Sequence, residues 1–396
     1  MYDKKQAVVF IGHGASRTGA PVSLLNVVKW IATNTDHPCI VVLGNAGPLV
    51  EEYSEYAAVH IWNKPVRSRP TFQRMFDDLL RLFSKLIPRS LERHQSHIIR
   101  QLKAQKISCI FNNTGVNGHI LEAIKPMNSA PVISRIPELE SYMRKNNRNG
   151  SVDKVLALTD HFVAVSNAVK NNLVDRHGVS PEKVSVIYGA CDTETVSTSN
   201  LGLREKLGIP SDAFLVGGCG TLEYHKGIDL FIQVANYCKM KLDSPALYFC
   251  WIGACVSLDS CIEYKYEIEQ LELSEHFFFL GEVPNTAAYF AEMDFFLLTS
   301  REDSFPLVIL EAARQGIPIA CFEGGGGATE FVDDTVGVTL QLLDVEGMGR
   351  SILALKSSPE LHARLAAGAY KKSLDYTPER MGKEINDVIT SLTTPT

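Results

Sequence analysis

The sequence contains no long apolar run. No stretch approaches the ~18–20 consecutive apolar residues that a membrane-spanning helix needs, and Met1 to Gln6 are polar and lead directly into an apolar strand. The pattern of a secretory signal peptide is missing from this end of the chain. Low-complexity tracts and short-period repeats are absent as well. We therefore expect a globular, cytoplasmic protein.

Cysteine occurs nine times but never as a C-x2-C pair. An odd number of scattered cysteines does not form the framework of a disulfide-rich secreted domain, and the spacing of a zinc site is missing. The pattern indicates reduced thiols, most of them in the core. The net charge of −6 likewise gives no overall argument for binding nucleic acid.

One stretch departs from this balance: residues 64–106 contain eleven Lys or Arg residues against three acids. The stretch has a net charge of +8, so the rest of the chain sums to −14. Its apolar residues recur at helical spacing: Met75, Phe76, Leu79, Leu80, Leu82, Phe83 and Leu86. A basic amphipathic helix of this kind suits an anionic membrane surface. The alternative is a solvated helix packed on its own domain; no nucleic-acid reading module accompanies the charge.

The length of 396 residues exceeds the ~250–300 residues of a usual single core, so two domains are expected. Apolar strands alternate with helical patterns in both halves, which predicts two doubly wound parallel sheets. The strands predicted for the first half are Ala7–Ile11, Cys39–Leu43, Val59–Trp62, Ile107–Phe111, Pro131–Arg135, His161–Val165 and Val184–Tyr188. Those predicted for the second half are Phe214–Cys219, Leu247–Ile252, Phe277–Leu280, Phe295–Leu298, Ile317–Phe322 and Val338–Leu340.

We place the first domain at residues 1–192 and the second at residues 213–376. Residues 193–212 begin with a run rich in Thr, Ser and Asn, which is typical of a linker. The chain ends in a further helical pattern, Pro378–Leu392, within residues 377–396.

The stretch from Ser300 to Ala312 follows the apolar strand Phe295–Leu298 and opens a helix. Asp303 and Ser304 are good N-cap residues, and Pro306 suits the first helical position. A glycine followed closely by a proline stops the helix. A strand that leads into a capped helix leaves the first amides of that helix at the carboxyl edge of a sheet. Such an end suits a phosphate group.

Glu311 lies one turn inside this helix. Because helical side chains lean toward the N-terminus, its carboxylate should lie near the phosphate, and the ribose hydroxyls of a nucleotide are its expected partner. Asp303, on the loop before the helix, could face a sugar on the other side of the phosphates. The alternative is that Asp303 caps the helix and Glu311 is a surface acid.

Three glycine-containing loops stand between strands and helices. Gly12, Gly14 and Gly19 lie in the first, whose spacing is not G-x-G-x-x-G. The loop 220–227 brings Lys226 to a helix start, where a cation could reach a diphosphate. The loop 323–330 contains four consecutive glycines, which we expect to let a ligand approach the backbone.

Several motifs occur together along the chain. They are Gly-Ala-Pro (19–21), Val-Ser-Asn-Ala-Val (165–169), Gly-Thr-Leu-Glu-Tyr-His-Lys-Gly (220–227), Trp-Ile-Gly (251–253), Phe-Leu-Gly-Glu-Val (279–283), the run 294–300, the stretch 300–312 and Gly-Ile-Pro-Ile-Ala (316–320). With these motifs the chain resembles the retaining glycosyltransferases of family 4, which have the GT-B fold. The resemblance covers nearly the whole chain and is strongest from Phe214 to Val332. It implies two Rossmann-like domains that face a central cleft, and a final helix, within 377–396, that returns to the first domain.

The spacing of Asp303 and Glu311 resembles the E-x7-E element of that family. The resemblance implies that Glu311 holds the donor ribose and that Asp303, or its neighbour Glu302, faces the transferred sugar. Lys226 matches the lysine that neutralises the diphosphate leaving group. The other residues expected to bind the donor are Gly220, Thr221, Ser304, Phe305, Pro306, Leu307, Val308, Glu330 and, from the first half, Gly19.

Two departures from the family pattern stand out. Relatives often carry an arginine several residues before the lysine, where this chain has Gly220-Thr221. They also often carry a histidine, associated with the transferred sugar, where Ile136-Pro137 stands here. Four residues are candidates for that catalytic role or for the acceptor side: Glu138, Arg135, His119 and Ser166. For His119, a capping or surface role is an equal alternative.

The resemblance implies transfer of a sugar, with retention, from a nucleoside-diphosphate sugar to a hydroxyl of a glycan or lipid-linked acceptor, in cell-surface polysaccharide or lipopolysaccharide synthesis. No D-x-D-type metal site stands at a suitable strand end, so we expect cations to replace a metal ion and no cofactor to be needed. The basic stretch and the resemblance together favour a peripheral position on the inner face of the membrane. Two other functions stay open, a GT-B-fold sugar-nucleotide epimerase and a non-catalytic homologue that binds nucleotide sugars.

Overall fold

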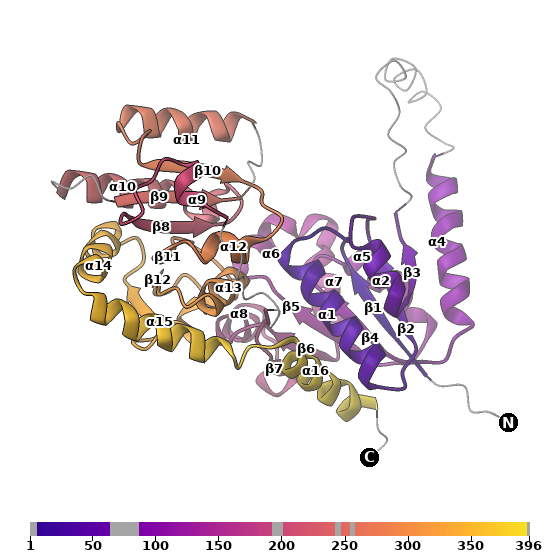
Figure 1. Cartoon of the computed structure of the whole chain (residues 1–396). Coiled ribbons are helices and arrows are strands. Elements are labelled where there is room, and N and C mark those ends of the chain that lie inside the picture. Colours follow the sequence, from indigo (N-terminus) through magenta and orange to yellow (C-terminus); the bar gives the residue numbers. More distant parts are fainter. Residues whose placement is uncertain (1–5, 64–86, 192–200, 242–246, 254–257, 394–396) are drawn as a thin grey trace. The chain divides into compact units, whose positions relative to one another are not determined.

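The computed structural model describes residues 6–63, 87–191, 201–241, 247–253 and 258–393. The chain divides into two compact units (Figure 1). The first unit contains residues 1–164, 170–187 and 381–396, and the second contains residues 165–169 and 188–380. Each unit is built on its own parallel β-sheet.

The first unit contains a seven-stranded sheet in the order β3-β2-β1-β4-β5-β6-β7. The strand order reverses between β1 and β4, and doubly wound sheets bind ligands at such a point. The strands are β1 (Ala7–Gly12), β2 (Cys39–Leu43), β3 (Ala58–Ile61), β4 (Ile107–Asn113), β5 (Val132–Ile136), β6 (His161–Ala164) and β7 (Val184–Val186). The helices are α1 (Gly19–Asn34), α2 (Val50–Tyr56), α4 (Ile87–Lys103), α5 (Gly118–Ile124), α6 (Glu140–Asn146), α7 (Ser151–Leu158), most of α8 (Asn167–His177) and most of α16 (Pro378–Thr393).

The neighbouring strands β1 and β2 of the first sheet are apolar and buried along their whole length. Every residue of β1 is buried, and Phe10 in its middle packs against Phe111 of β4 with 5.8 Å between the ring centroids. A strand that is covered on both faces needs a continuous apolar run rather than an alternating one. This requirement explains why short apolar runs in the sequence predicted strands.

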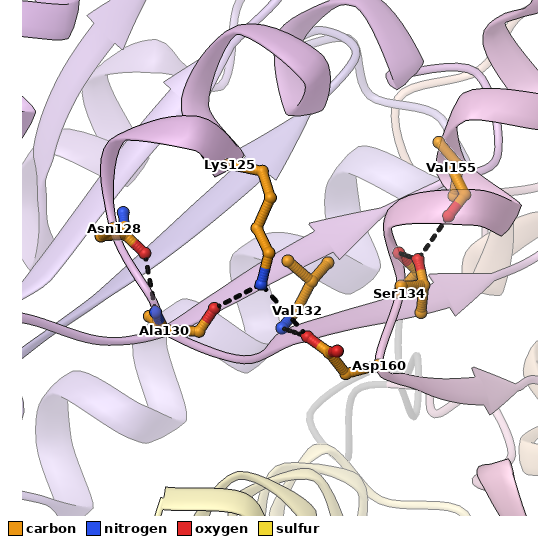
Figure 2. Close-up of polar contacts among 8 residues, drawn as sticks. Lys125, Asn128, Ala130, Val132, Ser134, Val155 and Asp160 are labelled. Atoms are coloured by element: carbon orange, nitrogen blue, oxygen red, sulfur yellow. Dashed lines mark hydrogen bonds and ion pairs between the residues drawn. The ribbon is translucent and has the colours of Figure 1, made fainter.

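A polar network holds the start of β5 in place (Figure 2). Asp160, just before β6, accepts a hydrogen bond from the backbone amide of Val132 through Oδ2 at 2.8 Å, and Lys125 Nζ lies 3.3 Å from the same oxygen. Lys125 also donates to the carbonyl oxygen of Ala130 at 2.9 Å. These bonds fix the amino end of β5, whose other end carries Arg135.

The second unit contains a six-stranded sheet in the order β10-β9-β8-β11-β12-β13. Its strands are β8 (Phe214–Cys219), β9 (Leu247–Ile252), β10 (Phe277–Gly281), β11 (Phe295–Leu298), β12 (Ile319–Phe322) and β13 (Gly337–Leu340). Its helices are α9 (Leu203–Lys206), α10 (Ile228–Lys241), α11 (Leu258–Gln270), α12 (Thr286–Phe290), α13 (Leu307–Arg314), α14 (Val345–Ser357) and α15 (Pro359–Ser373), with the short 3-10 turns η7 (Tyr224–Lys226) and η8 (Gly327–Glu330).

An aromatic cluster forms the centre of the second core. Phe231 of α10 lies against Phe249 and Trp251 of β9 and against Phe277 of β10, with 5.2 to 5.8 Å between ring centroids. Edge-to-face pairs of this kind stabilise a core beyond the apolar area that they bury. The cluster fixes α10 on the sheet, and α10 directly follows the loop that carries Lys226.

All thirteen predicted strands are present, and both sheets are parallel and doubly wound, as predicted. The final helix runs from Pro378 to Thr393, and its residues from Met381 onward belong to the first unit. A Cβ added at Gly382 would lie 2.2 Å from Trp30 Cγ, so α16 packs closely on α1.

The units divide at places that composition did not indicate. The second unit begins at Tyr188 rather than at residue 213, and it includes α9, which lies inside the predicted linker 193–212. Residues 165–169 also belong to the second unit. The predicted amphipathic helix Met75–Leu86 lies outside the described residues. Within the described part of the chain, no helix is both long and apolar enough to cross a membrane.

Candidate active site

The carboxyl ends of β8 and β11 meet where the strand order of the second unit reverses. The two strands are neighbours, with Phe295 paired with Val216 and Phe296 with Gly217. The chain after β8 carries Lys226 in η7, and the chain after β11 carries Asp303. The sheet therefore brings together two residues that are 77 positions apart in the sequence.

The loop after β8 depends on glycine geometry. Gly220 has a φ of 157° and Gly227 a φ of 70°, in the region that favours glycine. A Cβ on Gly227 would lie 2.0 Å from the carbonyl oxygen of Thr299, so this glycine lets η7 lie directly against the end of β11. The hydroxyl of Thr299 donates to the carbonyl oxygen of Lys226 at 3.3 Å. This close approach determines where Lys226 lies.

Lys226 and Asp303 form a partly buried ion pair. The distance from Lys226 Nζ to Asp303 Oδ2 is 2.6 Å, and the exposed fractions of the two side chains are 24% and 10%. Salt and solvent screen such a pair less than a pair on the surface. A phosphate oxygen is the same kind of partner for an ammonium group as a carboxylate oxygen is. The pair therefore holds a cation at the place where a diphosphate is expected.

The predicted capping of the helix after β11 is wrong. Helix α13 begins at Leu307 with Pro306 as its N-cap residue, so neither Asp303 nor Ser304 holds the N-cap position. The carboxylate of Asp303 binds Lys226 instead, because a charge-assisted hydrogen bond to an ammonium group is stronger than one to a backbone amide.

Three of the four glycines at 324–327, the residues 325–327, lie against another segment of this chain. Asp303 forms an isolated parallel bridge with Gly326, and its amide donates to the carbonyl oxygen of Gly325 at 2.7 Å. A Cβ on Gly327 would lie 2.2 Å from the carbonyl oxygen of Ser304. We expected these glycines to let a ligand approach the backbone. In the structure, residues 303–304 approach it instead. The glycines thus hold the Asp303 segment in position.

Helix α13 follows the Asp303 segment along the chain and carries Glu311. The amides of Leu307 and Val308 have no acceptor within their own helix, so they form its positive end. Glu311, half-buried one turn further on, accepts a hydrogen bond from the Thr286 hydroxyl through Oε2 at 2.7 Å. Burial raises the pKa of Glu311, and the bond from Thr286 opposes that rise. The carboxylate is thus already engaged with a hydroxyl group, the partner that ribose would offer.

Glu330 and Ser166 both cap the start of α8. The carboxylate of Glu330 accepts hydrogen bonds from the amides of Asn167 and Ala168, from the Asn167 side chain and from the Tyr188 hydroxyl, at 2.8 to 2.9 Å. The two carboxylate oxygens of Glu330 thus already accept four hydrogen bonds. This arrangement offers no support for the predicted contact between Glu330 and the nucleotide sugar. Ser166 Oγ accepts the amide three residues further on at 3.2 Å, so this side chain caps α8. Ser166 is fully buried in the second unit, which counts against a place on the acceptor side.

The first unit holds a buried polar cluster at the carboxyl ends of β4 and β5. The exposed fractions of Arg135 and Glu138 are 3% and 6%. Glu138 Oε2 accepts the amide of Gly115 at 3.0 Å, and Arg135 Nη1 donates to Asn113 Oδ1 at 3.2 Å. Arg135 Nε has no hydrogen-bond partner among the described residues. Thr114 has a φ of 123°, a strained conformation for a β-branched residue and one that is often found at functional sites.

The surroundings of Glu138 shift its titration. Burial raises the pKa of Glu138 to about 7, although the amide of Gly115, the charge of Arg135 and the hydroxyl of Thr114 all oppose the rise. Burial also lowers the pKa of Arg135 to about 10, against the effect of Glu138. A carboxyl group with a pKa near neutrality can hold or release a proton at physiological pH, as catalytic acids and bases do.

The Glu138→Gln substitution is expected to flatten the pH dependence of stability. Because the folded-state pKa of Glu138 is raised from 4.5 to about 7, the folded protein binds more protons than the unfolded chain between these values. The free energy of unfolding should therefore fall as the pH rises through this window, by up to about 3 kcal/mol. Glutamine cannot ionise and should remove this decline. Urea unfolding across the window measures it, with Glu122→Gln on the surface of α5 as the control; parallel profiles for wild type and Glu138→Gln would contradict the assignment.

The remaining predicted residues lie at separate places. Gly19 is the first residue of α1, and His119 is the second residue of α5, with an exposed side chain. His119 thus fits the surface alternative. The Thr221 hydroxyl donates to Glu223 Oε2 at 3.1 Å. Asp303, rather than its neighbour Glu302, is the acid that pairs with Lys226.

Sequence reasoning missed three contributors to these sites. Thr286 is 25 positions from Glu311, and no local pattern connects them. The strain at Thr114 follows from its place after β4 and has no signal beyond the neighbouring glycine. Arg301 lies three residues beyond the end of β11, and its bidentate bond to Asp229 of α10 would have been a signal only if the two segments were known to meet.

The described residues contain no group of three or more His, Cys, Asp or Glu side chains that could hold a metal ion. The expectation that cations take the place of a metal ion stays a prediction.

Two family models match this chain. The model for glycosyl transferases group 1 matches residues 201–372, and the model for glycosyltransferase family 4 matches residues 17–195. Together the two matches cover most of the chain, so both of its halves are glycosyltransferase domains of the family 4 type. The first match falls on the half that carries the Lys226–Asp303 pair, and the second on the half that carries Arg135 and Glu138.

Solved structures of other glycosyltransferases share the fold. Anabaena Alr3699/HepE, in complex with UDP and glucose, has a TM-score of 0.79 at 20% identity, over 98% of this chain and 100% of that one. WaaG, a glycosyltransferase involved in lipopolysaccharide biosynthesis, has a TM-score of 0.71 at 13% identity, over 97% and 99%. The predicted GT-B fold is thereby confirmed for this glycosyltransferase.

Curated relatives match over shorter lengths. The O-antigen biosynthesis glycosyltransferase WclY of Escherichia coli is 28% identical over 35% of this chain and 36% of its own. A D-inositol 3-phosphate glycosyltransferase of Streptosporangium roseum is 24% identical over 60% of this chain and 56% of its own. A Campylobacter jejuni N-acetylgalactosaminyltransferase that acts on a diphospho-undecaprenol substrate is 26% identical over 55% and 58%. The chain thus spans less than two thirds of each of these relatives.

Proposed function

We propose that this glycosyltransferase moves a sugar from a nucleoside-diphosphate sugar, with retention at the anomeric carbon, to a hydroxyl of a glycan or lipid-linked acceptor. The observation that carries the proposal is the Lys226–Asp303 pair, held at 2.6 Å just before the first turn of α13. An ammonium group and a helix N-terminus together suit a diphosphate. The HepE complexes with UDP and with UDP-glucose support a donor of this type.

In this proposal, the ribose, the phosphates and the sugar of the donor follow one another along the second unit. Its ribose binds Glu311, where the Thr286 hydroxyl already occupies one carboxylate oxygen. Its phosphates bind the first amides of α13 and Lys226. Its sugar lies beside Asp303, whose carboxylate accepts hydrogen bonds from sugar hydroxyls once Lys226 turns to the phosphates. Each of these contacts pairs a group with a partner of opposite charge or complementary hydrogen-bonding capacity.

The reaction breaks the bond between the anomeric carbon and the phosphate oxygen, and the electron pair leaves with the nucleoside diphosphate. The acceptor oxygen forms the new bond on the same face of the sugar, and its proton passes to the departing phosphate oxygen. Lys226 and the amides of Leu307 and Val308 stabilise the negative charge that grows on the leaving group. Groups fixed in advance stabilise such charge with little reorganisation.

The buried polar cluster of the first unit is proposed to bind a hydroxyl of the acceptor. Support for this role comes from the raised pKa of Glu138, from the unpartnered Nε of Arg135 and from the strained backbone of Thr114. A buried donor without a partner is costly, so a ligand hydroxyl that satisfies it would be bound favourably. We propose that Glu138 takes the role that a histidine has in relatives.

The acceptor is proposed to belong to cell-surface polysaccharide or lipopolysaccharide synthesis at the inner face of the membrane. The relatives named for O-antigen synthesis and for a diphospho-undecaprenol substrate support this pathway. Helix α4 adds positive charge that an anionic surface would attract, through Arg93, Arg100 and Lys103. Sedimentation with anionic and with neutral vesicles tests the location: binding should require the anionic lipid and weaken at raised salt.

Incubation with a panel of UDP-, GDP-, ADP- and dTDP-sugars, with and without a lipid-linked glycan, tests the reaction. Transfer is expected only when the acceptor is present, with the product in the anomeric configuration of the donor, and EDTA should leave the rate unchanged. A rearranged nucleotide sugar formed without acceptor would identify an epimerase. Donor binding without turnover would identify a non-catalytic homologue.

A further inference from the structure

Two side chains of the second unit, Tyr224 and Arg301, stack on each other. The guanidinium carbon of Arg301 lies 4.0 Å from the centroid of the Tyr224 ring, and the tyrosine is 73% exposed. We call this pair the Tyr224 platform. Tyr224 is the first residue of η7, and Arg301 follows the end of β11, so the platform joins the two loops that carry Lys226 and Asp303.

The platform is rigid because Arg301 is held from several sides. Its Nη1 and Nη2 donate to the two carboxylate oxygens of Asp229 at 2.8 and 2.6 Å, in the bidentate geometry that arginine favours. Nη1 also donates to the carbonyl oxygen of Tyr224 at 2.8 Å, and the Arg301 amide donates to that of His225 at 2.8 Å. The arginine side chain is only 17% exposed. It therefore acts as the backing of the ring rather than as a group that binds a ligand itself.

A ring that is fixed on one face offers the other face to a ligand at little entropic cost. An exposed tyrosine that moved freely would lose rotamer freedom on binding, whereas this one is already ordered. Asp229 neutralises the charge of Arg301, so the platform suits a neutral partner. The flat C–H face of a pyranose ring is such a partner, and tyrosine combines an apolar face with a hydroxyl that can bond a sugar hydroxyl.

The place of the platform indicates which ring it would bind. Tyr224 precedes Lys226 by two residues, and Arg301 precedes Asp303 by two residues. In the proposed donor orientation, the nucleoside lies toward Glu311 and the transferred sugar lies beside Asp303. The platform thus adjoins the sugar end of the donor, whereas a nucleobase would lie at the opposite end.

We propose that the Tyr224 platform binds a pyranose ring of the acceptor glycan by stacking. The proposal rests on the proposed function, because it takes the orientation of the donor from it. It adds a subsite for the acceptor on the second unit.

Saturation-transfer NMR on the full chain tests this subsite. The probes are the nucleoside diphosphates UDP, GDP, ADP and dTDP and three neutral saccharides: methyl α-glucopyranoside, maltotriose and N,N′-diacetylchitobiose. Tyr224→Ala is expected to weaken binding of the saccharides by roughly tenfold while UDP binding is unchanged. Tyr224→Phe keeps the ring and should retain most of the binding. Arg301→Lys loses the bidentate bond to Asp229 and should weaken it to an intermediate degree. Tyr266→Ala, which removes a tyrosine that is 60% exposed on α11, is the matched control and should change nothing.

Three results would overturn the subsite. They are unchanged saccharide binding in Tyr224→Ala, absence of saturation transfer to every saccharide in the wild type, and loss of UDP binding in Tyr224→Ala, which would mark a nucleobase platform. Failure of the proposed function has a different signature, since the wild type would then bind none of UDP, GDP, ADP and dTDP. The two failures are thus separated in the same measurement.

Discussion

Replacing Glu311 with alanine is expected to lower kcat/KM for the nucleotide sugar by roughly 10²- to 10⁴-fold. A carboxylate that accepts both ribose hydroxyls makes two hydrogen bonds, each contributing ~1.5–3 kcal/mol because the acceptor is charged. About 1.4 kcal/mol corresponds to a tenfold change. Glu311→Gln keeps the shape and one acceptor oxygen, so its loss should be smaller. Steady-state kinetics with the donor varied, together with calorimetric binding of UDP, measure both effects.

The loss should not come from unfolding. Burial raises the pKa of Glu311, which means that its ionised form is a cost to the folded state at neutral pH. The alanine variant should therefore unfold at a temperature no lower than that of wild type. Glu346→Ala, on the surface of α14, removes a carboxylate whose side chain is 68% exposed and serves as the control. Full turnover of Glu311→Ala at a subsaturating donor concentration would rule out the ribose contact.

The sheets of this protein could be predicted because their strands obey a local rule. Buried parallel strands such as Cys39–Leu43 and Phe295–Leu298 are short continuous apolar runs, and the structure places both at the predicted residues. The loops were also recognisable, because each lies between an apolar run and a helical pattern. The general location of Lys226, Asp303 and Glu311 followed from this order, since parallel strands share one carboxyl edge.

The partners of the site residues could not be predicted in the same way. Asp303 satisfies the local rule for a capping residue, but Lys226 takes its carboxylate after the sheet has brought two distant loops together. Glu330 similarly lies beside four glycines, a pattern typical of ligand loops, yet its carboxylate caps α8 more than 160 residues earlier in the chain. In both cases a tertiary contact overrides the local preference of the sequence.

The buried cluster of the first unit shows the same limit. The resemblance to the family identified Arg135 and Glu138 as candidates, because the histidine of the family pattern is missing here. The raised pKa of Glu138 depends on how completely the fold buries it, and the strain at Thr114 depends on the packing of β4. Neither property belongs to the residues by themselves, so neither can be read from the sequence.

Replacing Lys226 with methionine is expected to lower kcat by about 10²- to 10³-fold, the effect typical of removing one group that stabilises charge in a transition state. Methionine keeps the unbranched apolar stem but removes the ammonium group. Because negative charge on the leaving phosphate is greater in the transition state than in the bound donor, kcat should fall more than KM rises. Lys239→Met, which removes a surface ammonium group of α10, is the control for the loss of one positive charge.

This substitution also removes the partner of Asp303, so the structural and catalytic effects must be separated. The carboxylate of Asp303 is only 10% exposed, and leaving it without a cation should destabilise the single variant by roughly 1–3 kcal/mol. The double variant Lys226→Met with Asp303→Asn has no unpaired charge and should recover most of that stability. Turnover should stay low in the double variant, because the leaving group still lacks its cation. Recovery of turnover together with stability would show that Lys226 only positions Asp303, and the proposed stabilisation of the diphosphate would then be wrong.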